Sequence, residues 1–354
     1  MTPVLPSAEE EIWRYSRIGE LDLAQFAPGR ARTETINADP VRSTSRLAGA
    51  AMEIPADVFA ELNLAHGEEI GLSIPKGKSV EGVIEIVHTV DADGTVNYPR
   101  LVIDAGEDSE VTVVERFVSA DGVRSLVVPV LEVRAARSAR VNYVSVNELG
   151  SATWMIGHQQ SVGHRDSTTR LSTVALGGDY ARVRAEARLV EQGANAQQLA
   201  LYFASGTQMH DFRTLQRHEA PRTHSDLLFK GAVGGSARSV YTGLIHIAKN
   251  AAHSEAFQTN RNLTLGEGAW AESVPNLDIQ TNEVKCSHAS TVGSIEDEHR
   301  FYLESRGVPP EVAERLIVFG FFNDVLDRLP RGVDADPLRR AVADKLARET
   351  GAAS

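Results

Sequence analysis

The chain has 354 residues, of which 42% are hydrophobic and 24% are charged, and its formal net charge is −12. A chain of this length and composition can bury a substantial core in one or two globular domains. The negative charge leaves no general attraction for phosphate backbones or anionic lipids, so we expect neither nucleic acid nor membrane partners.

The sequence also indicates a compartment. Met1 to Glu11 carries acids where a signal peptide needs basic residues, and no later stretch approaches about 18 consecutive apolar residues. The single cysteine cannot form an internal disulfide, which is typical of a reducing compartment. We therefore expect a cytoplasmic protein.

Residues 1–75 are expected to form an N-terminal region of helices and loops. Ser7 is followed by acidic residues and then by an apolar pattern, which predicts a short amphipathic helix from Ser7 to Leu21. A polar, turn-rich stretch follows. A second short helix is predicted from Pro55 to Leu64, because proline is favoured in the first turn of a helix.

Residues 76–290 consist of short β-rich runs with no helical periods between them. The runs are Val83–Val90, Glu110–Val118, Ser125–Val133, Arg140–Val146, Arg170–Leu176, Arg182–Val190, Leu199–Phe203, Leu227–Val233 and Ser239–Ile247. Ala-Arg pairs at Ala139, Ala181 and Ala237 recur at multiples of 14, which suggests a solenoid, although three such pairs also fall in phase by chance. Hairpin signals such as Asp93-Gly94 are few, so a parallel β-helix is favoured over a sandwich or barrel.

Residues 291–354 return to helical patterns. Glu296 to Ser305 is expected to end at Gly307, Pro309-Pro310 opens a helix to about Leu329, and a last amphipathic segment runs from Pro337 to Glu349. The middle helix is apolar on nearly every side and needs cover, since it carries Leu316, Phe319, Phe322, Val325 and Leu326. The predicted fold is mainly β, a parallel β-helix core flanked by N- and C-terminal α-helical regions.

Cys286 and His288 are the residues with the clearest chemical potential. They lie two positions apart in a short predicted strand, so their side chains point to the same face. Thiolate and imidazole both bind iron, but a cluster takes about four protein ligands, so this pair supplies half a site at most. The alternative is that Cys286 is a small buried apolar residue and His288 a hydrogen-bonded polar one.

Two other motifs are weaker. Gly71 to Ser79 resembles a phosphate-binding loop but has five residues between its glycines, where four are needed, and no helix after it. We therefore expect no nucleotide site in this chain. The acids Asp104, Glu107, Asp108 and Glu110 suit a carbohydrate-active β-helix enzyme, but only 6% of the residues are aromatic and no signal peptide precedes them.

The stretch from Thr259 to Leu329 resembles the C-terminal core of the SufB/SufD family, which serves iron–sulfur cluster assembly. The resemblance covers about 70 residues and depends on the order of four segments, Asn260–Leu265, Ser273–Leu277, Lys285–Ile295 and Phe301–Gly307. From about Val80 to this stretch the chain is compatible with the family but does not identify it.

Within the family, the chain is more similar to the SufD branch. Lys285 to Thr291 reads Lys-Cys-Ser-His-Ala-Ser-Thr, close to the Lys-Cys-Ser-His-Gly-Ala-Thr of that branch, with departures at Ala289 and Ser290. The SufB branch carries a cysteine where this chain has Ile279.

The resemblance implies a right-handed parallel β-helix and a scaffold with no catalytic residue of its own. It further implies a heterodimer with SufB and docking of the SufC ATPase on the C-terminal helices through Leu316, Phe319, Phe322, Val325 and Leu326. Cys286 and His288 would hold a nascent iron–sulfur cluster, or iron, transiently at the SufB interface. A homodimer of the chain alone is the alternative, although Ile279 leaves it without a second thiol.

Overall fold

The structure is a computed structural model that describes residues 4–52 and 54–349. Its strands are β1 (Ala27–Pro28), β2 (Arg32–Ile36), β3 (Glu68–Ile74), β4 (Ile84–Val90), β5 (Thr95–Asn97), β6 (Pro99–Ala105), β7 (Glu110–Ser119), β8 (Ser125–Val127), β9 (Val130–Ala135), β10 (Arg140–Glu148), β11 (Trp154–Gly163), β12 (Thr168–Ala175), β13 (Tyr180–Leu189), β14 (Asn195–Ala204), β15 (Met209–His218), β16 (His224–Gly234), β17 (Arg238–Ile247), β18 (Glu255–Leu265), β19 (Trp270–Ile279) and β20 (Lys285–Gly293). The α-helices are α1 (Val58–His66), α2 (Asp297–Ser305), α3 (Pro310–Leu326) and α4 (Asp336–Glu349), and single 3₁₀ turns are η1 (Glu11–Trp13), η2 (Ile18–Glu20), η3 (Leu23–Gln25) and η4 (Asp39–Val41).

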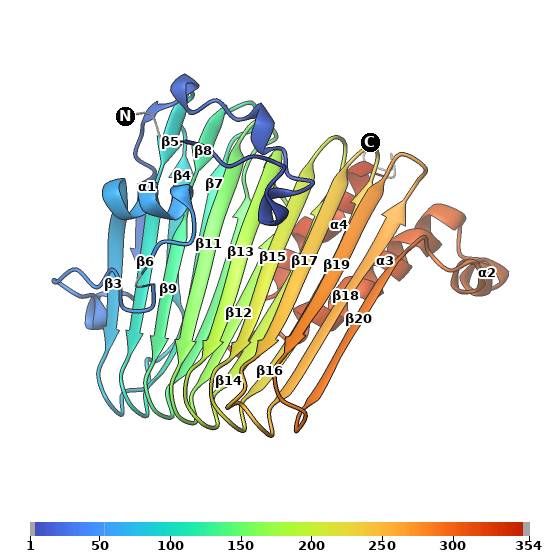
Figure 1. Ribbon diagram of the computed structural model, residues 1–354. Helices are drawn as coiled ribbons and strands as arrows, with labels where there is room; N and C mark the ends of the chain where they lie inside the picture. Colours follow the sequence, from blue (N-terminus) through green and yellow to red (C-terminus); the bar gives the residue numbers. More distant parts are fainter. Residues whose placement is uncertain (1–3, 53, 350–354) are drawn as a thin grey trace.

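Two long sheets face one another and form a solenoid (Figure 1). Sheet A runs β1-β5-β8-β11-β13-β15-β17-β19, with β3, β6 and β9 joined to it through β11, and sheet B runs β2-β4-β7-β10-β12-β14-β16-β18-β20. Between the described strands every pairing is parallel except that of β2 with β4. The prediction of a mainly β, parallel solenoid with helices towards its ends is confirmed.

The Ala-Arg pairs do not mark the repeat. Ala181 pairs with His210, and His210 pairs with Ser239, so the equivalent position two coils later is Ser239 rather than Ala237. Coils also differ in length, since the step from Arg140 to its partner Thr168 is longer than the step from Thr168 to its partner Asn195. Turns of unequal length accommodate the difference, so a strict period of 14 is wrong.

Several strands were not predicted from the sequence, because both their inner and their outer faces carry polar side chains. β11 holds buried Gln159 and Gln160, and β15 holds buried Asp211 and Arg213, which breaks the apolar alternation that marks a strand in sequence. β3, inside the region expected to be helical and loop, pairs with β6 in sheet A.

The predicted helix from Ser7 to Leu21 is wrong, because the segment forms only single 3₁₀ turns. Its carbonyl groups bind arginines of sheet A instead of helical N–H groups: Arg182 donates to Ile12 O at 2.6 Å and Arg213 donates to Arg14 O at 2.5 Å. Trp13 is buried against the outer face of sheet A, with the Arg182 guanidinium 3.9 Å from its ring centre. This N-terminal strap therefore owes its shape to the sheet beneath it.

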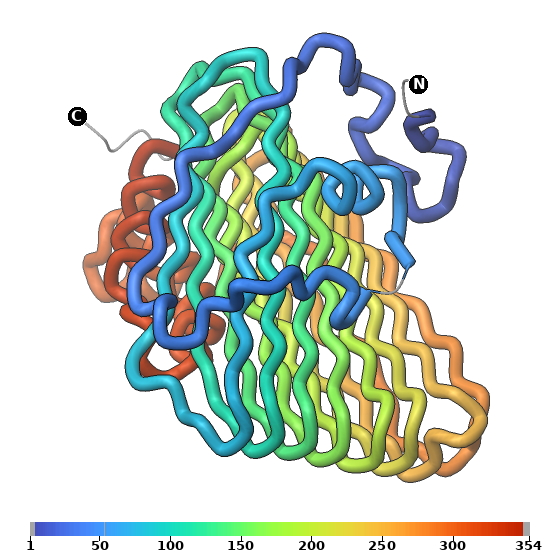
Figure 2. Tube along the Cα trace, turned by 90° about the vertical axis from the view of Figure 1, so that its left-hand side faces the viewer, coloured from blue at the N-terminus to red at the C-terminus, as the bar shows by residue number. Residues whose placement is uncertain are grey.

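The other predicted helices are present, but α1 begins at Val58, so Pro55 lies before the helix and not in its first turn. α1 begins after Asp57, whose carboxylate accepts from the N–H groups of Phe59 and Ala60 at 3.0 Å. α2 ends before Gly307, which has a φ of +86°, and α3 begins at Pro310. α3 and α4 pack on the outer face of sheet B, while the N-terminal strap lies on the opposite side of the solenoid (Figure 2).

Candidate functional site

The two ends of the solenoid differ. At the N-terminal end, β2 pairs with β4 and Ser43 N donates to Gly71 O at 2.8 Å, so the chain itself covers the first strands. At the other end sheet A stops at β19 and sheet B stops at β20, and in the described chain no strand pairs with the outer edge of either (Figure 1). The last coil is therefore open.

Cys286 and His288 lie on β20 in this last coil. They pair with Ala256 and Gln258 of β18, both of which are buried inside the solenoid. Since side chains on paired positions of neighbouring strands point the same way, Cys286 and His288 both face the interior. His288 is nevertheless exposed, because no further coil covers it.

Cys286 is the more sheltered of the two. It is half-buried and packs against the apolar cluster of Ile245, Ile247, Ala251 and Ala256. Burial raises the pKa of its thiol above the ordinary value. The thiol is thus protonated at neutral pH and must lose its proton before it can bind a metal.

Three apolar side chains share the open end. Leu277, Ile279 and Val292 are all exposed, although their positions face the interior of the preceding coils. Ile279 pairs with Ile247, which is fully buried, whereas Ile279 itself is 38% exposed. The last coil thus presents an unfinished core, that is, an apolar interior surface that no further coil of the described chain covers.

Hydroxyl groups connect the two last strands. Ser290 Oγ of β20 donates to Ser273 Oγ of β19 at 2.6 Å, and Ser273 Oγ donates to Asn260 Oδ1 at 2.7 Å.

Ala289, which stands where the SufD-branch motif has glycine, lies in β20 opposite Thr259 and does not have a positive φ. Alanine is therefore compatible with this backbone.

Across the described residues, no three His, Cys, Asp or Glu side chains gather closely enough to hold a metal ion. Cys286 and His288 thus remain a pair of donors on one strand.

The structure divides the five apolar residues predicted to bind a partner. Phe322, Val325 and Leu326 are buried against sheet B and α4, so they are core residues and are not available to another chain. Leu316 is 51% exposed, and it lines a groove of about 400 Å³ between α3 and α4 together with Phe319. Sequence reasoning missed the exposed Phe301 and Tyr302 of α2, because that helix lacks the nearly continuous apolar pattern of α3.

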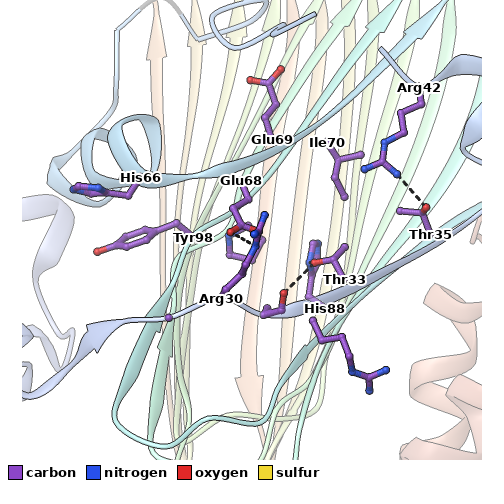
Figure 3. A pocket seen from close by; sticks show the side chains of 14 residues that line it. Arg30, Thr33, Thr35, Arg42, His66, Glu68, Glu69, Ile70, His88 and Tyr98 are labelled. Atoms are coloured by element: carbon purple, nitrogen blue, oxygen red, sulfur yellow. Dashed lines mark hydrogen bonds and ion pairs between the residues drawn. The ribbon is translucent and has the colours of Figure 1, made fainter. Parts of the chain in front are cut away.

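A second cavity, of about 390 Å³, lies at the N-terminal end of the solenoid (Figure 3). Two of its polar contacts are internal: Arg30 is paired with Glu68, and His88 Nδ1 lies 2.9 Å from Thr33 Oγ1. It is separated from Cys286 and His288 by the length of the sheets, so it is not part of their site.

Two of the four acids considered for carbohydrate chemistry are held in ion pairs. Glu107 is paired with Lys76 and Arg137, and Asp104 with Arg134. The hydrogen bond from Lys76 lowers the pKa of Glu107, whereas a general acid needs a raised one. The stretch from Gly71 to Ser79, which resembles a phosphate-binding loop, follows a strand but does not lead into a helix. β3 ends at Ile74, and Lys78 N donates to Pro75 O in the turn after it.

None of the helices in the described ranges is long and apolar enough to cross a membrane.

Comparison with known proteins agrees with the resemblance. Residues 88–321 match the family model described as "SUF system FeS cluster assembly, SufBD core domain". An iron–sulfur cluster assembly SufBD family protein of Mycobacterium tuberculosis is 32% identical over 352 residues, which cover 92% of this chain and 85% of that protein. SufD of Escherichia coli is 27% identical over 282 residues, 78% of this chain and 66% of that protein. SufD of Bacillus subtilis is 28% identical over 261 residues, 73% of this chain and 60% of that protein.

Proposed function

Because the chain belongs to the SufB/SufD family of the SUF iron–sulfur cluster assembly system, we propose that it is a non-catalytic scaffold subunit that completes a cluster site only together with SufB. The open last coil supports this proposal, since a strand edge that no described strand pairs with lies there beside a thiol and an imidazole, two groups that are able to bind iron. We place its work in the cytoplasm, where a single free thiol stays reduced.

The partner joins through the edges of β19 and β20. A free strand edge presents unpaired N–H and C=O groups, which another chain can extend as a further strand. The exposed Leu277, Ile279 and Val292 add apolar surface at the same end. A SufB chain seated there would continue both sheets and cover the unfinished core.

The cluster or its iron is the substrate of this site and is bound transiently. His288, exposed and inward-facing, is the first donor, and Cys286 is a second donor once its thiol loses a proton. SufB supplies the remaining ligands, since the two donors of this chain are half of what a cluster takes.

SufC docks on the C-terminal helices. The groove between α3 and α4 is lined by Leu316 and Phe319 beside Arg315, and α2 exposes Phe301 and Tyr302 as a further apolar surface. SufC brings the nucleotide site.

The experiment is co-expression with SufB and SufC, followed by anaerobic purification and measurement of mass, iron and sulfide. We expect a complex that contains SufB and holds iron. Charges placed at the open end, in the double variant Leu277→Asp and Ile279→Asp, should release SufB and leave the melting temperature of the chain alone nearly unchanged, because both side chains are already exposed.

A matched control is Ile247→Asp, which puts the same charge one coil deeper, where it is fully buried and should unfold the chain. If the chain forms stable homodimers and does not bind SufB, the proposal is contradicted and the homodimeric scaffold is favoured.

A further inference from the structure

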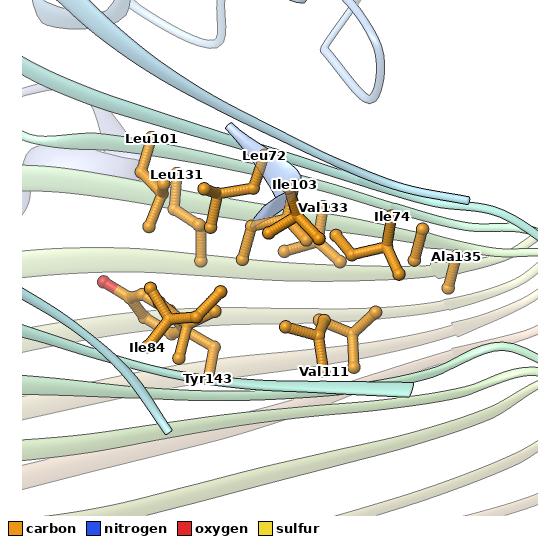
Figure 4. Packing of buried hydrophobic residues seen from close by; sticks show 14 of the residues in the cluster. Leu72, Ile74, Ile84, Leu101, Ile103, Val111, Leu131, Val133, Ala135 and Tyr143 are labelled. Carbon is orange, nitrogen blue, oxygen red and sulfur yellow. The ribbon is translucent and has the colours of Figure 1, made fainter. Parts of the chain in front are cut away.

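The interior of the solenoid changes in character along its axis. In the first coils it is filled by aliphatic side chains such as Leu72, Ile103 and Val133 (Figure 4). In the last coils it also holds polar side chains beside the apolar cluster under Cys286, and Asn260 and Asn262 are almost fully buried there. Buried amides destabilise a fold unless they are hydrogen-bonded, so the change calls for an explanation.

Most of these polar groups satisfy one another. Tyr202 OH donates to Asn262 Oδ1 at 2.7 Å, Asn262 Nδ2 donates to Asn260 Oδ1 at 2.8 Å, and Ser273 and Ser290 continue the line to the open end. This network is closed within the chain. Among the buried amides of β18 it leaves one out.

That amide belongs to Gln258, the residue paired with His288 in the β-ladder. Gln258 is only 2% exposed, and among the described residues neither its Oε1 nor its Nε2 has a hydrogen-bond partner. Gly243 on the facing sheet makes room for it, since a Cβ at Gly243 would lie 2.6 Å from Gln258 Nε2. The fold therefore accommodates an unsatisfied amide directly behind the exposed imidazole.

An apolar side chain would fit at this position. Residues that pair with one another on successive strands of sheet B form a column, and Gln258 belongs to one of these columns. The residue paired with Gln258 on the preceding coil is Leu227, which is fully buried. The next position back is Gln198, whose Nε2 donates to Ala185 O at 3.2 Å while its Oε1 has no partner among the described residues, so Gln258 differs from it in having both amide atoms unpaired. Packing alone thus gives no reason for glutamine at position 258.

We propose that Gln258 is a positioning residue for His288, whose imidazole N–H it accepts with its amide carbonyl. Neighbouring strands are about 4.7–4.9 Å apart, so side chains at paired positions can reach one another. A hydrogen bond at one imidazole nitrogen decides the tautomer and directs the lone pair of the other nitrogen to a metal. The inference rests on the proposed function, since it takes His288 as an iron ligand.

The other residues behind the site do not offer the same acceptor. Ala256, behind Cys286, has no polar side-chain atom, and Asn260 Oδ1, behind Ser290, already accepts from Asn262 and Ser273. Lys285 faces outwards and is paired with Glu255 at 2.7 Å. Gln258 is the buried side chain of β18 whose acceptor is uncommitted in the described structure.

The first test needs neither iron nor SufB. NMR of the full chain with ¹⁵N-labelled histidine reports the tautomer of His288 in the wild type and in Gln258→Leu. We expect one neutral tautomer to dominate in the wild type and both to be populated in the variant. An identical tautomer ratio in the two proteins would overturn the inference.

The second test measures iron(II) affinity and melting temperature of the complex with SufB under anaerobic conditions. Gln258→Leu should weaken iron binding about 10- to 100-fold, as loss of an outer hydrogen-bond partner does in other metal sites. Its melting temperature should stay equal or rise, because an unpaired buried amide is replaced by a side chain that the column accepts at Leu227.

Two further variants separate the explanations. Gln258→Glu keeps an acceptor and should retain iron binding, with the pH of half-maximal binding moved upwards because a carboxylate raises the imidazole pKa. Gln198→Leu, two coils deeper in the same column, should leave iron affinity unchanged.

A lower melting temperature of Gln258→Leu with unchanged tautomer and iron affinity would make Gln258 structural and overturn the inference. A changed tautomer together with iron binding that survives His288→Ala would instead contradict the proposed function and leave the hydrogen bond standing.

Discussion

Cys286 and His288 are two positions apart on one strand face, yet their surroundings assign them different tasks. Cys286 rests on buried aliphatic side chains and has a raised thiol pKa, so it contributes packing at neutral pH. His288 is exposed at the open end. A residue whose loss costs little stability is the better candidate for chemistry.

His288→Ala is therefore expected to change the free energy of unfolding by less than about 0.5 kcal/mol, since an exposed side chain loses little on truncation. Iron bound per complex should fall about 10-fold or more if His288 is a ligand, by analogy with the cost of disturbing a metal's surroundings. Denaturant titration and anaerobic iron determination check the two parts.

The matched control is Ser287→Ala on the same strand, at an exposed position that faces outwards. Equal iron content in His288→Ala and in the control would show that His288 is not a ligand.

Among the secondary-structure elements, α3 has one face that is buried in the core and another that lines the groove against α4. Phe322, Val325 and Leu326 join the core on sheet B, where Phe322 lies 6.1 Å from Phe203 between ring centres. Leu316 and Phe319 turn to the groove against α4. The sequence shows apolar residues on nearly every side of this helix and does not say which side the chain itself covers.

This division predicts two phenotypes within one helix. Phe322→Ala should destabilise the fold by about 3–5 kcal/mol, because it empties a buried ring site. Leu316→Asp should leave the melting temperature nearly unchanged and weaken SufC binding, because its side chain is already half exposed. Thermal unfolding and SufC pull-down, run on both variants, distinguish the two effects. If SufC binding is lost only in the variant whose melting temperature falls, α3 is not a docking surface.

For the whole molecule, the N-terminal strap and the C-terminal helices brace opposite sheets while the last coil stays open. Lys345 helps to fasten α4 to the turns of the solenoid. Its Nζ donates to Gln208 Oε1 at 2.5 Å and to the carbonyl of Leu176. Burial lowers the pKa of Lys345 to about 7.

The sign of the resulting pH dependence follows from proton binding. Between about pH 7 and pH 10 the unfolded chain holds the lysine proton and the folded chain has released it, so Lys345 makes stability rise with pH in this window. Lys345→Met should flatten that rise. Melting temperatures at pH 7, 8.5 and 10 check this, with Lys249→Met at an exposed turn as the control; parallel curves for wild type and Lys345→Met would contradict it.

The sequence by itself determined the solenoid class, the C-terminal helices and the candidate pair Cys286 and His288. These follow from local signals: short β-rich runs, prolines and glycines at helix boundaries, and the alternation of a strand. The order of motifs from Thr259 to Leu329 also identified the family, which the match over residues 88–321 bears out.

Only the tertiary structure decided what surrounds those residues. Whether Phe322 or Leu316 is covered, whether Ser7 to Leu21 is a helix or a strap, and which residue lies behind His288 all depend on contacts between segments far apart in the chain. Gln258 and His288 lie on separate strands, a full coil apart along the chain, and carry no mutual signal in sequence. They meet because one coil brings each strand back beside its predecessor, and the open end arises because that return stops at β20.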